Sequence, residues 1–327
     1  DNRLNLRLNY FNSRTNDLLT YQSLSFVSGL EKNWCNGGSL KNNGFDITAI
    51  GKVINTKNFT WKLGASVGHY KNEIVSLPEG ADYIDNTVYG ATIRTQVGKA
   101  ANLFYGYRTN GVFKSTEEAK EAGLYILGSN GMDKNYFGAG DMKFVDKDGN
   151  HVINSKDCEV IGDPNPDIYG NIFTSFAYKR VRLDFNFNYS LGNDVYNYMR
   201  QQLESGSRFM NQTLAMTNRW QSEGQVTSMP KATFQDPMGN SRFSDRWIED
   251  GSYLRLKTVT LSYTLPMNST FLQGLEFWVQ ANNLFTLTKY LGSDPEFSMT
   301  SSVIGQGIDL GQLPQSPSFL AGIKINL

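Results

Sequence analysis

Apolar and polar residues alternate one by one along several stretches of the chain. In the clearest stretch, from Val181 to Leu191, every second residue is apolar and the residues between are Arg, Asp, Asn and Ser. Because successive side chains of a β-strand point to opposite faces, this pattern predicts strands with one apolar and one polar face. We count about eight, at residues 2–12, 45–53, 61–67, 167–178, 180–192, 258–265, 277–282 and 319–327.

The connections between these strands alternate between short and long. Short turns are expected at 55–58, 179–180 and 266–274, and long polar segments at 27–42, 73–166, 193–252 and 291–315. This layout is typical of a bacterial outer-membrane barrel, with short periplasmic turns and long extracellular loops. The alternative is a soluble sandwich or lipocalin-like barrel, in which loops are usually short. The sequence therefore favours an all-β, antiparallel transmembrane barrel whose apolar face contacts lipid and whose polar face lines a lumen.

Composition and charge narrow the possible partners. The 31 basic and 31 acidic residues cancel, so no overall field attracts nucleic acid. Hydrophobic content of 39% with 13% aromatic residues suits a sheet that has water on one side. The chain of 327 residues contains no run of about 18 apolar residues, so no transmembrane helix is predicted. No catalytic motif such as G-x-S-x-G, a P-loop or H-E-x-x-H is found, and we expect no enzyme.

Four stretches, found in the same order as in the family, resemble the C-terminal part of the SusC/RagA family of TonB-dependent outer-membrane transporters of Bacteroidetes. The most specific is DRWIEDGSYLRLKTVTLSYTLP at 245–266, followed by NNLFTLTKYLGSDPEFS at 282–298. The others are VGKAANLFYGYRTNGVF at 97–113 and the run from GDMKFVDKDGN to VIGDPNPDIYGN at 140–171. The resemblance implies a large single-chain barrel in the outer membrane, with a plug in its lumen.

The same resemblance implies import of a nutrient, an oligosaccharide or a peptide, together with a SusD-like surface lipoprotein that covers the barrel. Residues 1–327 show neither a plug nor enough strands for such a barrel, so we expect its C-terminal portion, with 73–166 and 193–252 as long extracellular loops carrying short helices. TonB would act through the missing N-terminal part. The alternative function is a SusC-like scaffold within a larger outer-membrane assembly.

A calcium loop is predicted at residues 146–157. Side-chain oxygens stand at loop positions 1, 3, 5, 9 and 12, and a main-chain carbonyl stands at position 7. The six expected ligands are Asp146, Asp148, Asn150, Val152, Asn154 and Asp157. His151 replaces the usual glycine and Asp157 the usual glutamate, and the alternative is an acidic turn bonded to its own backbone. Such an ion would be structural.

Two helices are expected in the long segments. Ser115 to Gly123 has a capping box and a terminal glycine. Residues 195–220 carry aromatic and methionine side chains that either pack locally or form a docking face for a partner.

Residues at polar positions of the strands are the candidates for contact with cargo or plug. The alternative for each of them is a position in the barrel wall that contacts only water. The candidates are Arg182, Asp184, Asn186, Asn188, Trp278, Gln280 and Asn282. Aromatic residues near strand ends are expected in the interfacial girdles, namely Tyr10, Trp61, Tyr263 and Tyr290.

Overall fold

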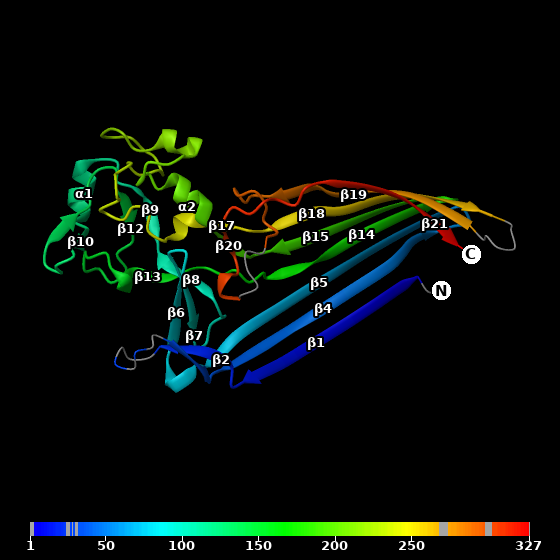
Figure 1. Ribbon diagram of the computed structural model, residues 1–327, viewed down its shortest axis with the longest axis horizontal. Helices are drawn as coiled ribbons and strands as arrows, with labels where there is room; N and C mark the ends of the chain where they lie inside the picture. The colour runs from blue at the N-terminus through cyan, green and yellow to red at the C-terminus, as the bar shows by residue number, and fades with distance from the viewer. Residues whose placement is uncertain are drawn as a thin grey trace.

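The computed structural model describes residues 3–23, 27, 29, 32–267, 274–297 and 303–326. Eight long strands form one antiparallel sheet, in which neighbours along the chain are also neighbours in space (Figure 1). In sheet order they are β1 (Leu4–Asn16), β4 (Ser39–Asn55), β5 (Phe59–Ser76), β14 (Ile168–Tyr178), β15 (Val181–Leu191), β18 (Tyr253–Pro266), β19 (Gly274–Thr288) and β21 (Ser318–Asn326). All eight predicted strands are confirmed; residues 2 and 327 of the predicted ranges lie outside the described residues.

The connections at the two ends of the sheet differ as predicted. The turns 55–58 and 179–180 lie at the end where both chain termini are found, and the folded long segments gather at the opposite end (Figure 1). Between β18 and β19, residues 268–273 lie outside the described part of the chain. In the long polar segment predicted at 27–42, the described residues include strand β3 (Lys32–Asn36), which pairs with β2 (Leu19–Ser23), and the first residues of β4.

Strand register joins the apolar positions into one continuous face. Leu183, Leu261 and Val279 are direct neighbours on three successive strands. Across the other strands of the sheet, positions of the apolar face likewise pair with positions of the apolar face. Leu6 on β1 is 55% exposed and Phe319 on β21 is 77% exposed. Among the described residues, no second layer covers this face. A soluble barrel or sandwich closed within these residues would bury this face in a core, whereas the described sheet is open and leaves it exposed.

The long segments fold into a compact unit, which we call the cap, formed by residues 83–162, 194–250 and 303–309. Its four-stranded sheet has the order β13 (Cys158–Gly162), β8 (Leu103–Tyr107), β7 (Ala91–Gln96) and β6 (Tyr83–Val88). The cap also contains two antiparallel pairs of strands. They are β9 (Thr109–Val112) with β12 (Met142–Phe144), and β10 (Tyr125–Leu127) with β11 (Lys134–Tyr136). The third sheet has β16 (Asp194–Asn197) between β17 (Ile248–Asp250) and β20 (Ile308–Asp309), and β20 runs parallel to β16.

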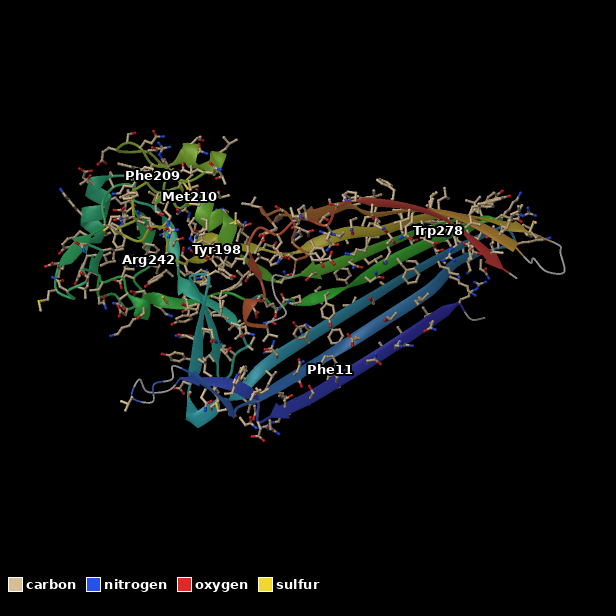
Figure 2. All side chains as sticks on the ribbon, in the orientation of Figure 1. Phe11, Tyr198, Phe209, Met210, Arg242 and Trp278 are labelled. Carbon is tan, nitrogen blue, oxygen red and sulfur yellow. The ribbon has the colours of Figure 1, made fainter. Side chains whose placement is uncertain are left out.

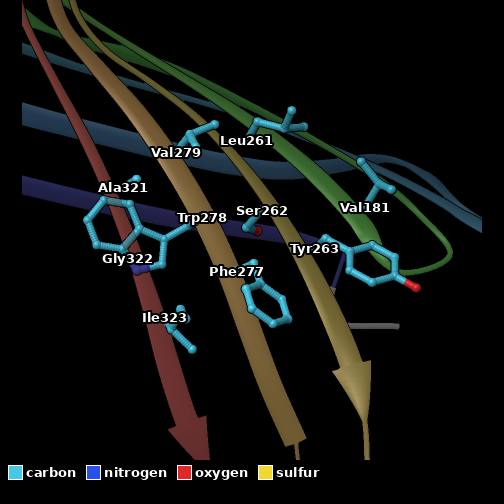
Figure 3. Close-up of a pocket in the computed structure, with 10 residues that line it drawn as sticks. All are labelled: Val181, Leu261, Ser262, Tyr263, Phe277, Trp278, Val279, Ala321, Gly322 and Ile323. Carbon is cyan, nitrogen blue, oxygen red and sulfur yellow. The ribbon is translucent and has the colours of Figure 1, made fainter.

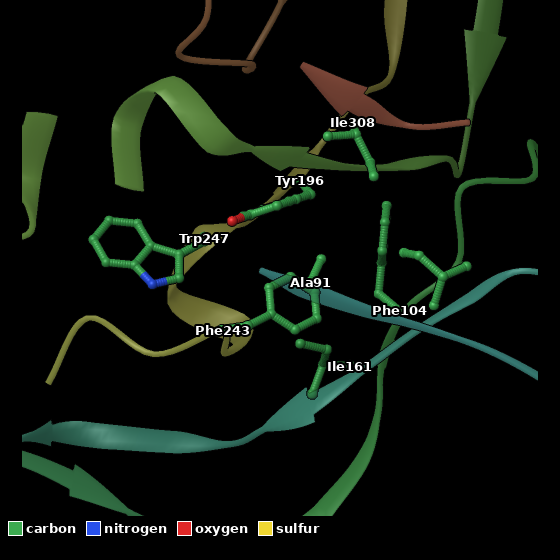
Figure 4. Packing of buried hydrophobic residues seen from close by; sticks show 8 residues of the cluster. Ala91, Phe104, Ile161, Tyr196, Phe243, Trp247 and Ile308 are labelled. Atoms are coloured by element: carbon green, nitrogen blue, oxygen red, sulfur yellow. The ribbon is translucent and has the colours of Figure 1, made fainter. Parts of the chain in front are cut away.

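Two apolar cores hold the cap together. The first brings all three chain segments of the cap into contact, as Figure 4 shows; its buried members are Ala91, Ile93, Phe104, Ile161, Tyr196, Phe243, Trp247 and Ile308. The second lies under α1 (Thr116–Ala122) and contains Phe113, Ala119, Leu124, Phe137, Met142, Phe144 and Ile153. The long segments carry short helices, α1 and α2 (Tyr198–Glu204), as predicted, and in addition they fold around shared cores that the sequence did not predict.

Of the two predicted helices, one is confirmed and one is mostly wrong. Ser115 accepts a hydrogen bond from the Glu118 amide and Gly123 ends α1 in the left-handed conformation, as the capping box predicted. In 195–220, however, the chain begins as strand β16, and α2 covers only Tyr198–Glu204. Gly206, with a φ of 62°, turns the chain directly after this helix. A short 3₁₀ helix follows at Leu214–Asn218.

Further short 3₁₀ helices complete the described elements, at Pro78–Gly80, Ser155–Asp157, Asp245–Trp247 and Val303–Gly305. Within the described residues, no helix combines the length and the apolar character needed to cross a bilayer.

Candidate functional site

The polar face of the sheet brings together all seven predicted wall residues. The register of β15, β18 and β19 sets six of them in three rows across the sheet. The rows are Arg182–Ser262–Trp278, Asp184–Thr260–Gln280 and Asn186–Thr258–Asn282. Asn188 continues the face next to Arg255. All seven side-chain positions are opposite the apolar face. Their contact with cargo or a plug stays a prediction.

Amide side chains on this face are partly bonded to one another. Asn171 donates from Nδ2 to Asn186 and, at 3.1 Å, to Asn188. Gln280 Nε2 donates to Asn282 Oδ1 at 2.7 Å, and Asn282 Nδ2 donates to Ser318 Oγ at 2.9 Å. Since each amide offers two N–H donors and an oxygen with two lone pairs, these bonds leave capacity for a further polar partner.

Aromatic rings on the same polar face lie over glycines of the neighbouring strand. Phe11 covers Gly44, Phe173 covers Gly64 and Trp278 covers Gly322, so that a Cβ atom at any of these glycines would come closer than 3.0 Å to the ring. Figure 2 shows Phe11 and Trp278 on β1 and β19. Phe11 and Phe173 were not among the predicted wall residues, although each is an aromatic residue at a position of the strand where the alternation predicts a polar one.

The segment after β19 is fixed to the sheet by buried charges. We call residues 290–297 and 303–315 the strap. Arg255 of β18 is 3% exposed and forms an ion pair with Asp294, which is 6% exposed. Lys257 Nζ donates to Gln315 Oε1 at 2.8 Å and contacts Glu296 at 3.1 Å. Within the predicted loop 291–315, the described residues 291–297 and 303–315 are therefore folded and anchored to the sheet.

The strap also overturns one predicted girdle residue. Tyr290 is buried and its hydroxyl donates to Asp309 Oδ2 at 2.5 Å, so it cannot face lipid. Of the other three, Tyr10 and Tyr263 are exposed on the apolar face, and Trp61 stacks on Phe176 with 5.8 Å between ring centroids. Their place in an interfacial girdle stays a prediction.

The acidic loop at 146–157 has a defined geometry. Asp146 accepts hydrogen bonds from the amides of Gly149, Asn150 and His151, and His151 adopts a φ of 64° where glycine was expected. The carboxylates of Asp146, Asp148 and Asp157 bring one oxygen each within 4.8 Å of the others. Two oxygens that bind one ion at about 2.4 Å can be at most about 4.8 Å apart, and the three carboxylates meet this limit; calcium binding stays a prediction.

The other three predicted ligands are engaged within the loop. Asn154 Nδ2 donates to the Val152 carbonyl at 3.0 Å, and Asn150 Nδ2 donates to Asp148 at 2.8 Å. Asp157 accepts from the Lys147 and Asn154 amides. These bonds are those of the alternative acidic turn, and they coexist with the converging carboxylates. Ile153 anchors the loop in the second core of the cap.

Residues of 195–220 divide between the cap interior and its surface. Tyr196 and Met216 are buried, whereas Phe209 and Leu214 are 95% and 86% exposed. Phe209 lies against Phe234 with 5.1 Å between ring centroids, and Figure 2 shows Phe209 and Met210 at the outside of the cap. Exposed aromatic and aliphatic side chains of this kind form a candidate docking surface.

Carboxylates gather where the cap joins the sheet. Asp194 accepts a hydrogen bond from the Asp163 amide at 2.8 Å. Burial raises the pKa of the Asp194 carboxyl above its ordinary value, and the nearby Asp163, Asp250 and Asp167 raise it further. Asp250, opposite Asp194 in the β16–β17 pair, has the reverse shift, because a hydrogen bond from Ser252 lowers its pKa.

No family model matches the chain. It is 31% identical over 338 residues to the TonB-dependent receptor P3 of Formosa agariphila, in a match that covers 99% of this chain and 32% of the relative. It is 28% identical to the TonB-dependent receptor SusC of Bacteroides thetaiotaomicron, covering 89% of this chain and 27% of that protein. A chain of the solved RagAB peptide transporter superposes with a TM-score of 0.74 at 25% identity, covering 99% of this chain and 33% of the other.

The chain belongs to the SusC/RagA family of TonB-dependent transporters.

As a member of the SusC/RagA family, the chain spans about a third of the length of the relatives it matches. The resemblance stated from its motifs is thereby confirmed, and so is the all-β barrel-type fold. The superposition includes the cap as well as the eight strands, since it covers 99% of the chain.

Proposed function

We propose that this SusC/RagA-family chain supplies part of the wall and the external loops of an outer-membrane importer of nutrients. The observation that carries the proposal is the sheet itself, with an exposed apolar face over eight strands and a hydrogen-bonded polar face opposite. Such a sheet is stable when one face contacts hydrocarbon and the other contacts water. Further strands and a plug complete the barrel, and TonB acts on the plug.

The cargo in this proposal is an oligosaccharide or a peptide. Both classes present hydroxyl or amide groups, which the spare donors and acceptors of Asn186, Asn188 and Gln280 can bind. The similarity to the RagAB peptide transporter supports the peptide, and the similarity to SusC supports import in general. A SusD-like lipoprotein covers the cap, where Phe209 and Leu214 offer apolar contact.

The test is uptake by a strain that lacks the gene for the full-length protein. Growth on a panel of glycans and peptides should fail for one class, and the wild-type gene should restore it. The double variant Asn186→Ala/Asn188→Ala should lower uptake about two- to tenfold, because each hydrogen bond lost to the cargo costs on the order of 1 kcal/mol. Asn58→Ala, in the short turn, is the matched control. Normal growth on every nutrient would favour the scaffold function instead.

We further propose that the 146–157 loop binds calcium with a structural role. The fit of three carboxylates to one ion supports it. At a calcium concentration a hundred times the Kd, the cap should gain about 2.7 kcal/mol of stability. Asp148→Asn should abolish the calcium-dependent rise in the melting temperature of the full-length protein, and Asp133→Asn, outside the loop, should keep it. A melting temperature unaffected by millimolar calcium would remove this proposal.

A further inference from the structure

A groove near the short-turn end is lined mainly by side chains of the apolar face, and Ser262, Trp278 and Gly322, at positions of the other parity, also contribute to its lining. It has two adjoining parts, of about 580 and 450 Å³, which share Leu261, Val279 and Ala321. Figure 3 shows the larger part, with lining residues on β18, β19 and β21 and with Val181 at the start of β15. The smaller part extends the groove toward Val259 and Phe319.

The groove follows from the register of the three strands. Tyr263, Phe277 and Ile323 form a row of large side chains across the sheet. Four residues further along each strand, Val259, Ala281 and Phe319 form a row in which only Phe319 is large. In the row between them, Ala321 stands beside Val279. The two alanines lie on a diagonal between large neighbours, so the surface is hollowed along that line. Three rows two residues apart span roughly 13 Å at about 3.4 Å per residue.

Two cationic residues lie at the end of the groove. Lys179 and Arg180 form the turn directly before Val181, and the Thr264 amide donates to the Arg180 carbonyl at 2.9 Å, which holds the turn beside β18. Arg180 is exposed. The Lys179 ammonium lies 5.5 Å from the centroid of the Tyr178 ring. In the part of the chain that the structure describes, neither Lys179 nor Arg180 has a carboxylate partner within ion-pair distance. The turn next to the groove thus carries two positive charges that no carboxylate neutralises.

We propose that this groove and turn bind one glycerophospholipid, with an acyl chain against Ala281 and Ala321 and the phosphate at Lys179 and Arg180. The proposal rests on the proposed function, because the apolar face must contact a bilayer. A flexible acyl chain fills a narrow hollow that a flat protein surface would leave empty, and a hollow without contact atoms loses dispersion energy. Basic residues at the membrane surface attract anionic head groups.

The test is native mass spectrometry of the full-length protein, purified in detergent and supplied with dipalmitoyl phosphatidylglycerol. The wild-type protein should retain one lipid. Ala321→Phe fills the hollow and displaces two or more methylene groups, so it should lower the retained fraction about tenfold. Lys179→Ser/Arg180→Ser should also lower it. Ala65→Phe, on the same face outside the groove, and Lys57→Ser, in another short turn, should retain lipid like the wild type.

Equal retention by Ala321→Phe and Ala65→Phe would overturn the proposal, as would a dimer of this chain seated on the face in place of lipid. Heat-modifiable migration of each variant checks that its barrel has formed, and Ala321→Leu replaces Ala321→Phe if that variant misassembles. Absence of the wild-type protein from the outer-membrane fraction would instead count against the proposed function. Membrane-inserted wild-type protein that retains no lipid counts against the groove alone.

Discussion

At the residue scale, the ion pair between Arg255 and Asp294 carries the largest energetic consequence. Both side chains are almost fully buried, and Asp294 also accepts hydrogen bonds from the amides of Glu296 and Gln315. Removing one charge would leave the other buried without compensation. The strap therefore depends on this pair far more than on any exposed pair of the sheet.

We predict that Arg255→Met destabilises the protein by about 3–5 kcal/mol and releases the strap. Limited proteolysis of the full-length protein should then cut within residues 290–315. The control is Arg182→Ser, which breaks the exposed pair with Asp184 at 2.9 Å and should cost under about 1 kcal/mol. Equal protease resistance of the two variants would show that the pair does not anchor the strap.

A second prediction at this scale concerns pH. The raised pKa of Asp194 means that its ionised form is disfavoured in the fold, so its contribution to stability falls as pH rises through the raised value. Asp194→Asn should therefore match or exceed the wild-type melting temperature at pH 7.5 and lose that advantage near pH 4. Asp250 has a lowered pKa, so Asp250→Asn should lower stability at pH 7.5 and have less effect in acid. Parallel pH profiles for the two variants would contradict this account.

At the scale of elements, the sheet relies on glycines that leave room for aromatic rings of the next strand. Gly64 accommodates Phe173, whereas a Cβ at Gly51 would meet no atom closer than 3.9 Å. We predict that Gly64→Ala costs about 1–3 kcal/mol by overpacking, while Gly51→Ala changes stability by less than about 0.5 kcal/mol. Urea unfolding of the full-length protein in detergent would measure both. Equal midpoints would mean that the ring moves aside freely.

Elements with a strong local signal could be predicted from the sequence. Alternation located seven strands of the sheet, a less regular pattern located the eighth at 167–178, and Ser115 with Gly123 delimited α1. The folding of the long segments could not be predicted, because the core of the cap joins residues far apart in the chain, such as Phe104, Tyr196 and Ile308. For the same reason Tyr290 was misplaced: its partner, Asp309, lies in a two-residue strand without any periodic pattern.

At the scale of the whole molecule, everything depends on which face of the sheet meets the bilayer. Phe185 and Asn186 are neighbours at the centre of β15 and lie on opposite faces. We predict that Phe185→Lys costs about 2–4 kcal/mol in the bilayer and impairs assembly, whereas Asn186→Lys is accepted by the wet face. Heat-modifiable migration and the amount of full-length protein in the outer-membrane fraction would compare them. Loss of assembly with Asn186→Lys alone would reverse the orientation.

The parallel pairing of β20 with β16 has a consequence for the order of events during biogenesis. Ile308 follows Ala91 far later in the chain, yet both belong to one core. The segment around Ile308 must therefore reach the cap before the segments around Ala91 and Tyr196 can complete their packing. Such distant closure is slow, because chain entropy is lost before contacts compensate it. The core of the cap is then expected to form later than the hairpins of the sheet.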